Sequence, residues 1–229
     1  MATRVAVVQF PGTNCELDVV EALVSLGAEA YVVFHDQGDL RGADAVVIAG
    51  GFAHGDYLRP GAIARFSPVM DAVRDLAGSG APVVGICNGF QVLTESHLLP
   101  GALQKNAGLK FRCGTSELRV ASTDSPLTSA CSVGDVLRIP INHFEGNYTC
   151  SSEVLAQLRD EDRIVLRYVD NPNGSVDDIA GICNEGRNVV GLMPHPERAV
   201  HELLGSTDGR VMLGSLLRGA ELSAAPQPA

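Results

Sequence analysis

The 229-residue chain contains no long apolar run. No stretch of about 18 consecutive apolar residues occurs, which argues against a transmembrane helix. The apolar stretch near the N-terminus, within "MATRVAVVQF", is too short for the core of a signal peptide. We therefore expect a cytoplasmic protein that makes no membrane contact.

Positive charge is also in short supply. Lys and Arg together number 17 against 27 Asp and Glu, so the formal net charge is −10 at pH 7. Nucleic acids and anionic membrane surfaces would repel such a chain as a whole. We expect neither as a partner.

The patterns that hold metals, disulfides and nucleotides are missing too. The cysteines stand at positions 15, 87, 113, 131, 150 and 183, with no C-x-x-C pair and no histidine at zinc-ligand spacing. No G-x-x-x-x-G-K-[ST] motif offers a phosphate cradle. We expect free thiols, no metal, and no cofactor on this chain.

The first half of the chain shows the pattern of an α/β protein. Helical patterns alternate with apolar runs that read as strands over Arg4–Phe10, Ala30–His35, Asp44–Gly50 and Pro82–Ile86. Strands that are apolar on both faces indicate a mostly parallel, doubly wound sheet with helices on both sides, a flavodoxin-like arrangement.

Two helices are predicted between these strands. Asn14 is a good N-cap and Gly27 a good C-cap for the first, whose apolar face is predicted to hold Leu17, Val20, Leu23 and Val24. The second covers residues 63–76, and a third helix is expected to start at Asn88.

Beyond Leu99 the strand-like segments become shorter and more frequent, as in "SELRVA", "VLRIPI", "RIVLRYV" and "NVVGLM". The C-terminal half is therefore expected to be richer in β structure. No linker or composition break interrupts the chain, so we predict one domain over residues 1–222 and a disordered tail over 223–229.

One cysteine stands where a parallel sheet binds its ligands. Cys87 lies in "GICNG", between a predicted strand and a predicted helix, with a glycine two positions away on each side. Such a turn can present a nucleophile, although a buried cysteine can also pack as a small apolar residue. The loops "PGTN" and "GGFAHGDY" follow two other strands and should meet it at the carboxyl edge of the sheet.

A catalytic thiol needs a base, and two histidines qualify. His195 is followed two residues later by Glu197, and His143 is followed in the same way by Glu145. In an extended segment this spacing places both side chains on one side, so that the acid can orient the imidazole. Either pair could instead be an ordinary surface pair, and spacing alone does not choose between them.

Five segments together resemble the class I glutamine amidotransferases: "FPGTNCELD", "GGFAHGDYLRPG", "GICNGFQVL", "NPNGSVDDIAGI" and "MPHPER". The resemblance implies that Cys87, His195 and Glu197 form a catalytic triad, with Gly50, Gly51, Asn88 and Gln91 binding the substrate or the oxyanion. One departure is that Asn142 and Phe144 are bulkier than the residues the family usually has beside the His143–Glu145 pair.

The second and fourth of these segments resemble one branch of the family, the ammonia-producing subunits of a synthase in purine biosynthesis. The resemblance implies hydrolysis of L-glutamine through a cysteine thioester. It also implies a large synthetase subunit that binds ATP, Mg²⁺ and formylglycinamide ribonucleotide, and a small third subunit in some complexes. "RPGAIARF", with Arg59 and Arg65, is either a docking segment or a solvated helix start.

Two other functions stay open at this point. A stand-alone cysteine hydrolase or peptidase could share the cysteine turn, and a regulatory module could keep the fold without catalysis. Substrate profiling separates the first from a glutaminase, because a glutaminase accepts glutamine and rejects peptides.

Overall fold

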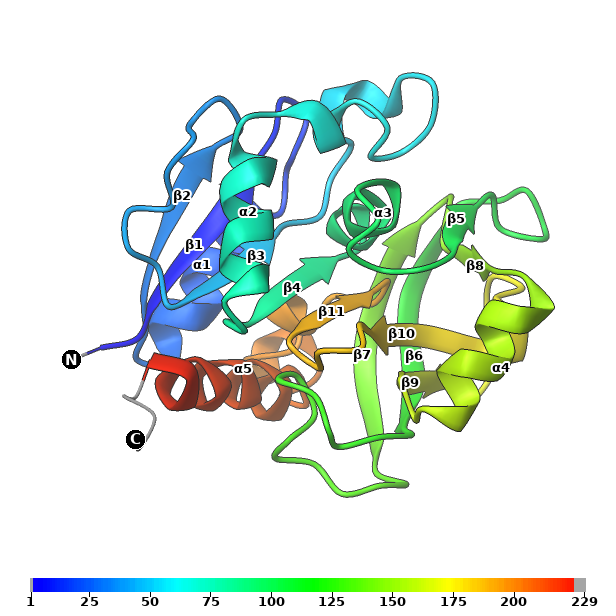
Figure 1. The fold of residues 1–229 in the computed structure, drawn as a ribbon. Coiled ribbons are helices and arrows are strands. Elements are labelled where there is room, and N and C mark those ends of the chain that lie inside the picture. Colours follow the sequence, from blue (N-terminus) through cyan, green and yellow to red (C-terminus); the bar gives the residue numbers. More distant parts are fainter. Residues whose placement is uncertain (1, 225–229) are drawn as a thin grey trace.

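A computed structural model of the protein describes residues 2–224 (Figure 1). A nine-stranded sheet runs through it in the order β2-β1-β3-β4-β11-β10-β9-β6-β7, and a separate pair, β5 and β8, lies beside one end. The first four strands are β1 (Arg4–Gln9), β2 (Glu29–Phe34), β3 (Ala45–Ile48) and β4 (Val83–Ile86). The remaining strands are β5 (Ala102–Gln104), β6 (Arg112–Val120), β7 (Val136–His143), β8 (Asn147–Thr149), β9 (Ile164–Tyr168), β10 (Ile179–Cys183) and β11 (Val189–Leu192).

Half of the large sheet is parallel. β1 pairs with β2 and β3, and β4 pairs with β3 and β11, all in parallel. Every residue of β3, β4 and β11 is buried, as expected for strands covered on both faces. This confirms the doubly wound α/β architecture that the apolar runs predicted.

The other half of the sheet is antiparallel. β10 pairs with β11 and β9, and β6 pairs with β9 and β7. Along β6 the burial changes from fully exposed over residues 112–115 to alternating over 116–120, so the far end of this half has one face in solvent. The β-rich character of the C-terminal half is confirmed.

Within residues 2–224, five α-helices connect or cover the strands: α1 (Glu16–Ser25), α2 (Val69–Gly78), α3 (Asn88–Glu95), α4 (Ser152–Asp160) and α5 (Gly209–Ala224). α2 and α3 pack against β4, whereas α1 and α5 both pack against a short 3₁₀ turn, η4 (Pro196–Arg198). In Figure 1, α4 lies beside the antiparallel half, far from α1.

The structure corrects the predicted first helix. α1 is capped by Cys15, not by Asn14, and its buried residues are Val19, Ala22 and Leu23. Leu17 and Val24 are 61% and 53% exposed. The apolar spacing fitted more than one helical face, and only the packing against β1 and β2 selects between them. Gly27 follows the helix with φ of +96°, as predicted for a terminating glycine.

The predicted helix over residues 63–76 is two elements. A 3₁₀ turn, η2 (Ala64–Phe66), ends before Ser67, which is extended, and α2 begins only at Val69. Pro68 explains the break, because a proline disfavours helical geometry in the residue before it.

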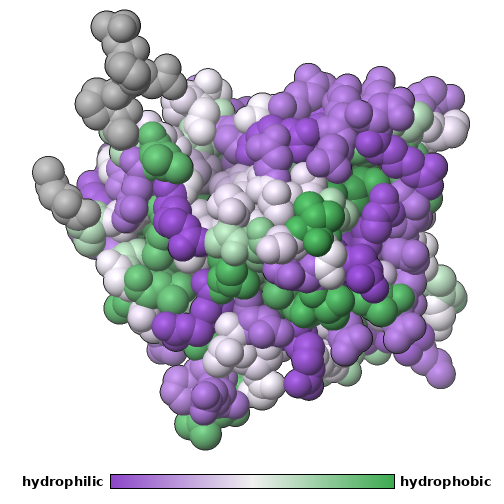
Figure 2. Space-filling model, turned by 90° about the horizontal axis from the view of Figure 1, so that it is seen from below, coloured by the Kyte–Doolittle hydropathy of each residue, from purple (hydrophilic) through white to green (hydrophobic). Residues whose placement is uncertain are grey.

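The predicted tail starts too early by two residues, because α5 continues through Ser223 and Ala224. Residues 225–229 lie outside the described part, so the prediction of disorder there stays a prediction, as does the single-domain assignment. Among residues 2–224, no helix has the length and apolar character needed to cross a bilayer. Figure 2, which views the molecule from below Figure 1, shows hydrophilic and hydrophobic residues interspersed, with the larger hydrophobic patches near the middle of this face.

Candidate active site

Cys87 lies at a sharp turn between β4 and α3. Its φ and ψ of 53° and −107° are a costly conformation for a residue with a side chain, of the kind found where a nucleophile is presented on a strand-to-helix turn. The glycine at position 89 is required by packing, because a Cβ there would lie 2.0 Å from the carbonyl oxygen of Ile48. The glycine spacing that predicted a tight turn is therefore explained by close contact between α3 and β3.

His195 and Glu197 form a buried pair. Nδ1 of His195 lies 2.7 Å from Oε1 of Glu197, and the two side chains are 1% and 0% exposed. β11 leads directly into this segment, and the backbone N–H of His195 donates to the carbonyl of Pro140 on β7. The carboxylate of Glu197 thus orients the imidazole ring. The other ring nitrogen of His195, Nε2, has no hydrogen-bond partner among the described residues.

The surroundings of His195 favour its charged form. Burial acts to lower the pKa of this imidazole, but the charges of Glu197 and Cys87 outweigh burial and raise the pKa well above its usual value. An imidazolium beside the thiol stabilises a thiolate, as the N-terminus of α3 also does.

A glycine loop holds the triad from the side of β3. A Cβ at Gly50 would lie 3.0 Å from Cε1 of His195 and 3.4 Å from Cβ of Cys87, so Gly50 packs against both residues. Gly51 has φ of +149°, and a Cβ there would come within 2.6 Å of Cα of Thr13. No other residue fits at Gly51 without moving the loop.

Asn88 and Gln91 lie on the first turn of α3, next to the nucleophile. As the first residue of the helix, Asn88 has a backbone N–H without an intrahelical acceptor, suited to an oxyanion at Cys87. Its side chain accepts from the backbone N–H of Ala53 at 2.9 Å and donates to Oε1 of Gln91 at 2.8 Å. The side chain of Asn88 therefore ties the glycine loop to α3.

The structure brings four of the predicted site residues, Gly51, Cys87, Gln91 and His195, into the lining of one pocket, and Gly50 and Asn88 lie directly beside lining residues. The lining side chains are Asn14, Cys15, Gly51, Phe52, Asp56, Cys87, Gln91, Asn142, His143, Phe144 and Glu145, together with His195. Glu197 stands behind His195.

The competing pair, His143 and Glu145, is arranged differently. The imidazole of His143 contacts Nδ2 of Asn173 through Nε2, at 3.1 Å, and no hydrogen bond joins it to Glu145 among the described residues. Burial and the nearby charge of His195 lower the pKa of His143 to about 4. His143 is therefore neutral and lacks an orienting acid, whereas His195 has one.

The bulky loop residues also belong to the pocket. The thiol of Cys87 lies 3.8 Å from the carbonyl oxygen of Asn142, and Lys105 stacks over the ring of Phe144 with its Nζ 5.9 Å from the centroid. The departure from the usual family pattern thus lies in the wall of the site itself.

Sequence reasoning gave no site role to four residues that line this pocket, Asn14, Cys15, Phe52 and Asp56. Cys15 caps α1 and is buried, and Nη2 of Arg198 donates to its sulfur at 3.2 Å. Asp56 lies in the "GGFAHGDY" loop and Cys15 directly follows the "PGTN" loop, the two loops predicted to meet at Cys87. A search of these loops and the residues beside them for polar side chains could have found both.

One group of side chains has metal-ligating atoms close together. One such atom from each of Cys15, His195 and Glu197 lies within 4.8 Å of the others. The guanidinium of Arg198 beside Cys15 and the ion pair of His195 with Glu197 both oppose a cation there. The expectation of no metal stays a prediction.

Arg59 and Arg65 both contact Glu95, near the end of α3. Arg59 donates to both carboxylate oxygens of Glu95, at 2.6 and 2.7 Å, and Arg65 donates to its backbone carbonyl. These contacts fix the segment against α3; a docking role for it stays a prediction.

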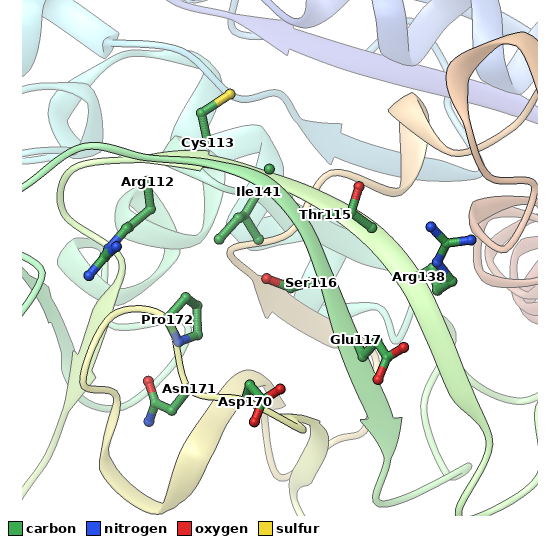
Figure 3. A pocket seen from close by; sticks show the side chains of 11 residues that line it. Arg112, Cys113, Thr115, Ser116, Glu117, Arg138, Ile141, Asp170, Asn171 and Pro172 are labelled. Carbon is green, nitrogen blue, oxygen red and sulfur yellow. The ribbon is translucent and has the colours of Figure 1, made fainter.

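A larger cavity, of about 710 Å³, lies elsewhere. Figure 3 shows that Arg112, Glu117 and Arg138 come from β6 and β7, whereas Asp170, Asn171 and Pro172 come from the loop after β9. None of the predicted catalytic or substrate-binding residues lines it. The small pocket at Cys87 is therefore the candidate active site.

Comparison with known proteins shows the family to which the chain belongs. Residues 2–211 match the family described as the CobB/CobQ-like glutamine amidotransferase domain. The chain is 56% identical over 219 residues to the phosphoribosylformylglycinamidine synthase subunit PurQ of Rubrobacter xylanophilus, covering 96% of this chain and all of that one. It is 53% identical to the PurQ subunit of Koribacter versatilis, covering 90% and 94% of the two chains.

Solved structures agree. A chain in the structure of PurLQS from Thermotoga maritima superposes with a TM-score of 0.88 at 43% identity, covering 95% of this chain and 99% of that one. A glutamine amidotransferase from Thermotoga maritima shares the fold alone, with a TM-score of 0.57 at 15% identity over 97% and 94% of the two chains. The chain therefore belongs to the CobB/CobQ-like glutamine amidotransferases and, within them, to the PurQ subunits of phosphoribosylformylglycinamidine synthase.

Proposed function

We propose that this chain hydrolyses L-glutamine to glutamate and ammonia and passes the ammonia to a synthetase subunit, which uses it to convert formylglycinamide ribonucleotide to formylglycinamidine ribonucleotide. The observation that carries the proposal is the buried pair of His195 and Glu197 beside a thiol on a strained turn. The names of the relatives supply the reaction in which the ammonia is used.

In the first half of the reaction, the thiolate of Cys87 attacks the side-chain amide carbon of glutamine. We assign the stabilisation of the oxyanion that forms to the backbone N–H groups of Asn88 and Gly51. His195 then gives its proton to the departing nitrogen, the C–N bond breaks, and ammonia leaves behind a γ-glutamyl thioester.

In the second half, neutral His195 takes a proton from water, which attacks the thioester. The C–S bond breaks, glutamate is released, and the thiolate and imidazolium are restored. Glu197 keeps the ring oriented through Nδ1 in both halves, so that Nε2 carries the proton each time.

The rest of the synthesis requires a partner. We place ATP and Mg²⁺ on a large synthetase subunit, because this sequence has no phosphate-binding motif. A small third subunit is part of the proposal, suggested by the PurLQS composition of the Thermotoga structure.

Replacement of the nucleophile tests this division of labour. In the reconstituted complex, Cys87→Ala should reduce glutamine-dependent amidine formation by at least about 10³-fold, yet leave synthesis intact when ammonium is supplied at high concentration. Cys183→Ala, at a buried thiol outside the pocket, is the control.

Three outcomes would contradict the proposal. Loss of both activities in a folded, assembled Cys87→Ala complex would mean that this chain takes part in the synthetase chemistry. ATP-dependent amidine formation by the isolated chain would reveal a nucleotide site. Hydrolysis of peptides in preference to glutamine by the wild-type chain would identify a peptidase.

A further inference from the structure

Two carboxylates stand at the rim of the active-site pocket. Asp56 lies in η1 (Ala53–Asp56), which follows β3, and Glu145 lies in the loop between β7 and β8. Both are partly exposed, whereas Cys87 and His195 at the base of the pocket are buried. The rim is therefore acidic at the point where a ligand enters.

Both acidic segments are fixed to the helix that starts at the nucleophile. Nδ2 of Asn88 donates to Oδ1 of Asp56 at 3.2 Å. Nε2 of Gln91 donates to the backbone carbonyl of Glu145 at 2.6 Å. The carboxylate of Asp56 and the backbone of Glu145 are therefore held against the start of α3, next to Cys87.

The carboxylates have no cation of their own in the pocket. No lysine or arginine is among its lining residues, and no ion pair of Asp56 or Glu145 occurs among the described residues. His143 is neutral and His195 is paired with Glu197. Lys105, which contacts Phe144, reaches Glu145 only from outside the pocket.

The pKa values of both carboxyl groups are raised by their surroundings. Burial, together with the charge of Glu145, raises the pKa of Asp56 to about 6, although the hydrogen bond from Asn88 opposes the rise. Burial also raises the pKa of Glu145, which Lys105 partly offsets. A cation bound in the pocket would stabilise the charged form of both carboxylates.

The imidazole of His195 marks where the amide end of a glutamine ligand would react. Nε2 of His195, on a side chain 1% exposed, lines the pocket and has no partner among the described residues. In an extended glutamine the α-nitrogen lies four bonds, about 5 Å, from the amide carbon. Asp56 lines the same pocket as Cys87 and is hydrogen-bonded to Asn88, the residue after Cys87. Its carboxylate can therefore reach the ammonium group of a glutamine whose amide is bound at Cys87.

We propose that Asp56, assisted by Glu145, binds the α-ammonium group of the substrate and thereby selects free glutamine over amides that lack this charge. This inference rests on the proposed glutaminase function. Charge-assisted hydrogen bonds to a carboxylate are among the stronger polar interactions in proteins. The specificity of the site for a free amino acid then resides in two carboxylates contributed by opposite halves of the sheet.

The test compares two amides in the reconstituted complex. L-glutamine carries the α-ammonium group and glutaric acid monoamide lacks it. Asp56→Asn should lower kcat/KM for glutamine by roughly 10- to 100-fold, mostly through KM, and leave the monoamide unchanged. Asp75→Asn, at an exposed carboxylate on α2, is the matched control and should alter neither substrate.

A direct binding measurement separates this inference from the proposed function. Calorimetric titration of glutamine into the Cys87→Ala complex requires no turnover, and adding Asp56→Asn should weaken binding by the same factor. If the wild-type complex does not hydrolyse glutamine but this binding difference holds, the proposed function fails and the ammonium site stands. If glutamine is hydrolysed and Asp56→Asn leaves both binding and the substrate ratio unchanged, the ammonium site is wrong.

The pH dependence of the glutamine KM and the thermal stability of the protein give two further tests. Glutamine KM should rise as the pH falls through about 6, because Asp56 loses its charge there, and Asp56→Asn should flatten this rise. Since the folded state binds the proton of Asp56 more tightly than the unfolded state, unfolding becomes easier as the pH rises towards 6. Above pH 6, Asp56→Asn should therefore raise Tm. Glu145→Gln should weaken glutamine binding by a smaller factor than Asp56→Asn does.

An equal loss for both amides would show that Asp56 acts only on the architecture of the pocket, and it would overturn the proposal.

Discussion

The two halves of the sheet contribute differently to the active site. In the parallel half, the loops after β1, β3, β4 and β11 all begin at the same edge of the sheet. These loops supply Cys87, the glycine loop and the His195–Glu197 pair. The antiparallel half supplies part of the pocket wall, through Asn142 at the end of β7 and through Phe144 and Glu145 in the loop that follows it.

The difference follows from strand direction. Parallel strands place all their carboxyl ends at one edge, so several loops can meet around one reacting atom. Antiparallel strands alternate in direction, and only some of their connections reach that edge. Changes in the parallel half should therefore affect the chemical step, and changes in the antiparallel half should affect the wall or the stability of the fold.

The largest contrast is expected between the two histidines. His195→Ala should lower glutaminase kcat by about 10²- to 10⁴-fold, because it removes the group that transfers protons. His143→Ala, in the antiparallel half, should cost far less, because that imidazole has a pKa of about 4 and stays neutral at the working pH. Steady-state kinetics of both variants measure the contrast.

His195→Ala leaves the Glu197 carboxylate buried without its partner, so circular dichroism and Tm must confirm that it is folded. His195→Gln, which keeps a polar group at this position, is a second variant for the same comparison. A folded, active His195→Ala protein beside an inactive His143→Ala protein would reverse the roles of the two histidines.

A smaller effect is expected in the glycine loop. Gly51→Ala places a Cβ within 2.6 Å of Thr13 at φ of +149°, so the loop must shift and one oxyanion donor moves with it. We expect kcat to fall by about 10²-fold, near the lower end of what such donors contribute. Kinetic measurement of Gly51→Ala against wild type tests this.

Gly78→Ala is the matched control, since nothing lies within 4 Å of its added Cβ and alanine favours the helical conformation. This variant should keep full activity and wild-type or slightly higher stability. Full activity in folded Gly51→Ala would remove Gly51 from the oxyanion site.

The smallest effect on catalysis is expected in the core of the antiparallel half. Ile139→Ala on β7 removes a fully buried side chain and should lower the free energy of unfolding by about 2–5 kcal/mol. At temperatures where the variant remains folded, kcat should change little. Val136→Ala, on the same strand but 43% exposed, should cost less than about 1 kcal/mol.

Urea denaturation and glutaminase assays on both variants give the two quantities. A large loss of kcat in folded Ile139→Ala protein would show that the antiparallel half takes part in the chemistry, and the comparison between the halves would fail.

Much of the parallel half could be predicted from residues close in sequence. The valine-rich runs became β1, β3, β4 and β11, because strands buried on both faces need apolar side chains at every position. The glycines around Cys87 predicted its turn, and the two-residue spacing predicted a contact that His195 makes with Glu197 but that His143 does not make with Glu145. Each of these features depends on local geometry.

Other predictions failed where several local solutions were equally good. The helical spacing in residues 16–25 allowed more than one buried face, and packing against β1 and β2 chose Val19 rather than Leu17. The strands β5, β8 and β10 and the helix α4 were not predicted, because their signals are short or weak and they depend on distant partners such as β9 and β11.

The sequence by itself determined the alternation of strands and helices, the turn at Cys87 and two histidines that each had an acid two residues away. Only the tertiary structure decided that His195 contacts its acid and His143 does not, because the contact of His143 with Asn173 joins residues 30 apart in sequence. Only the tertiary structure brought Asp56 and Glu145 to one pocket, because they follow strands in opposite halves of the sheet. A carboxylate pair without a cation is a property of three-dimensional surroundings, and no local pattern encodes it.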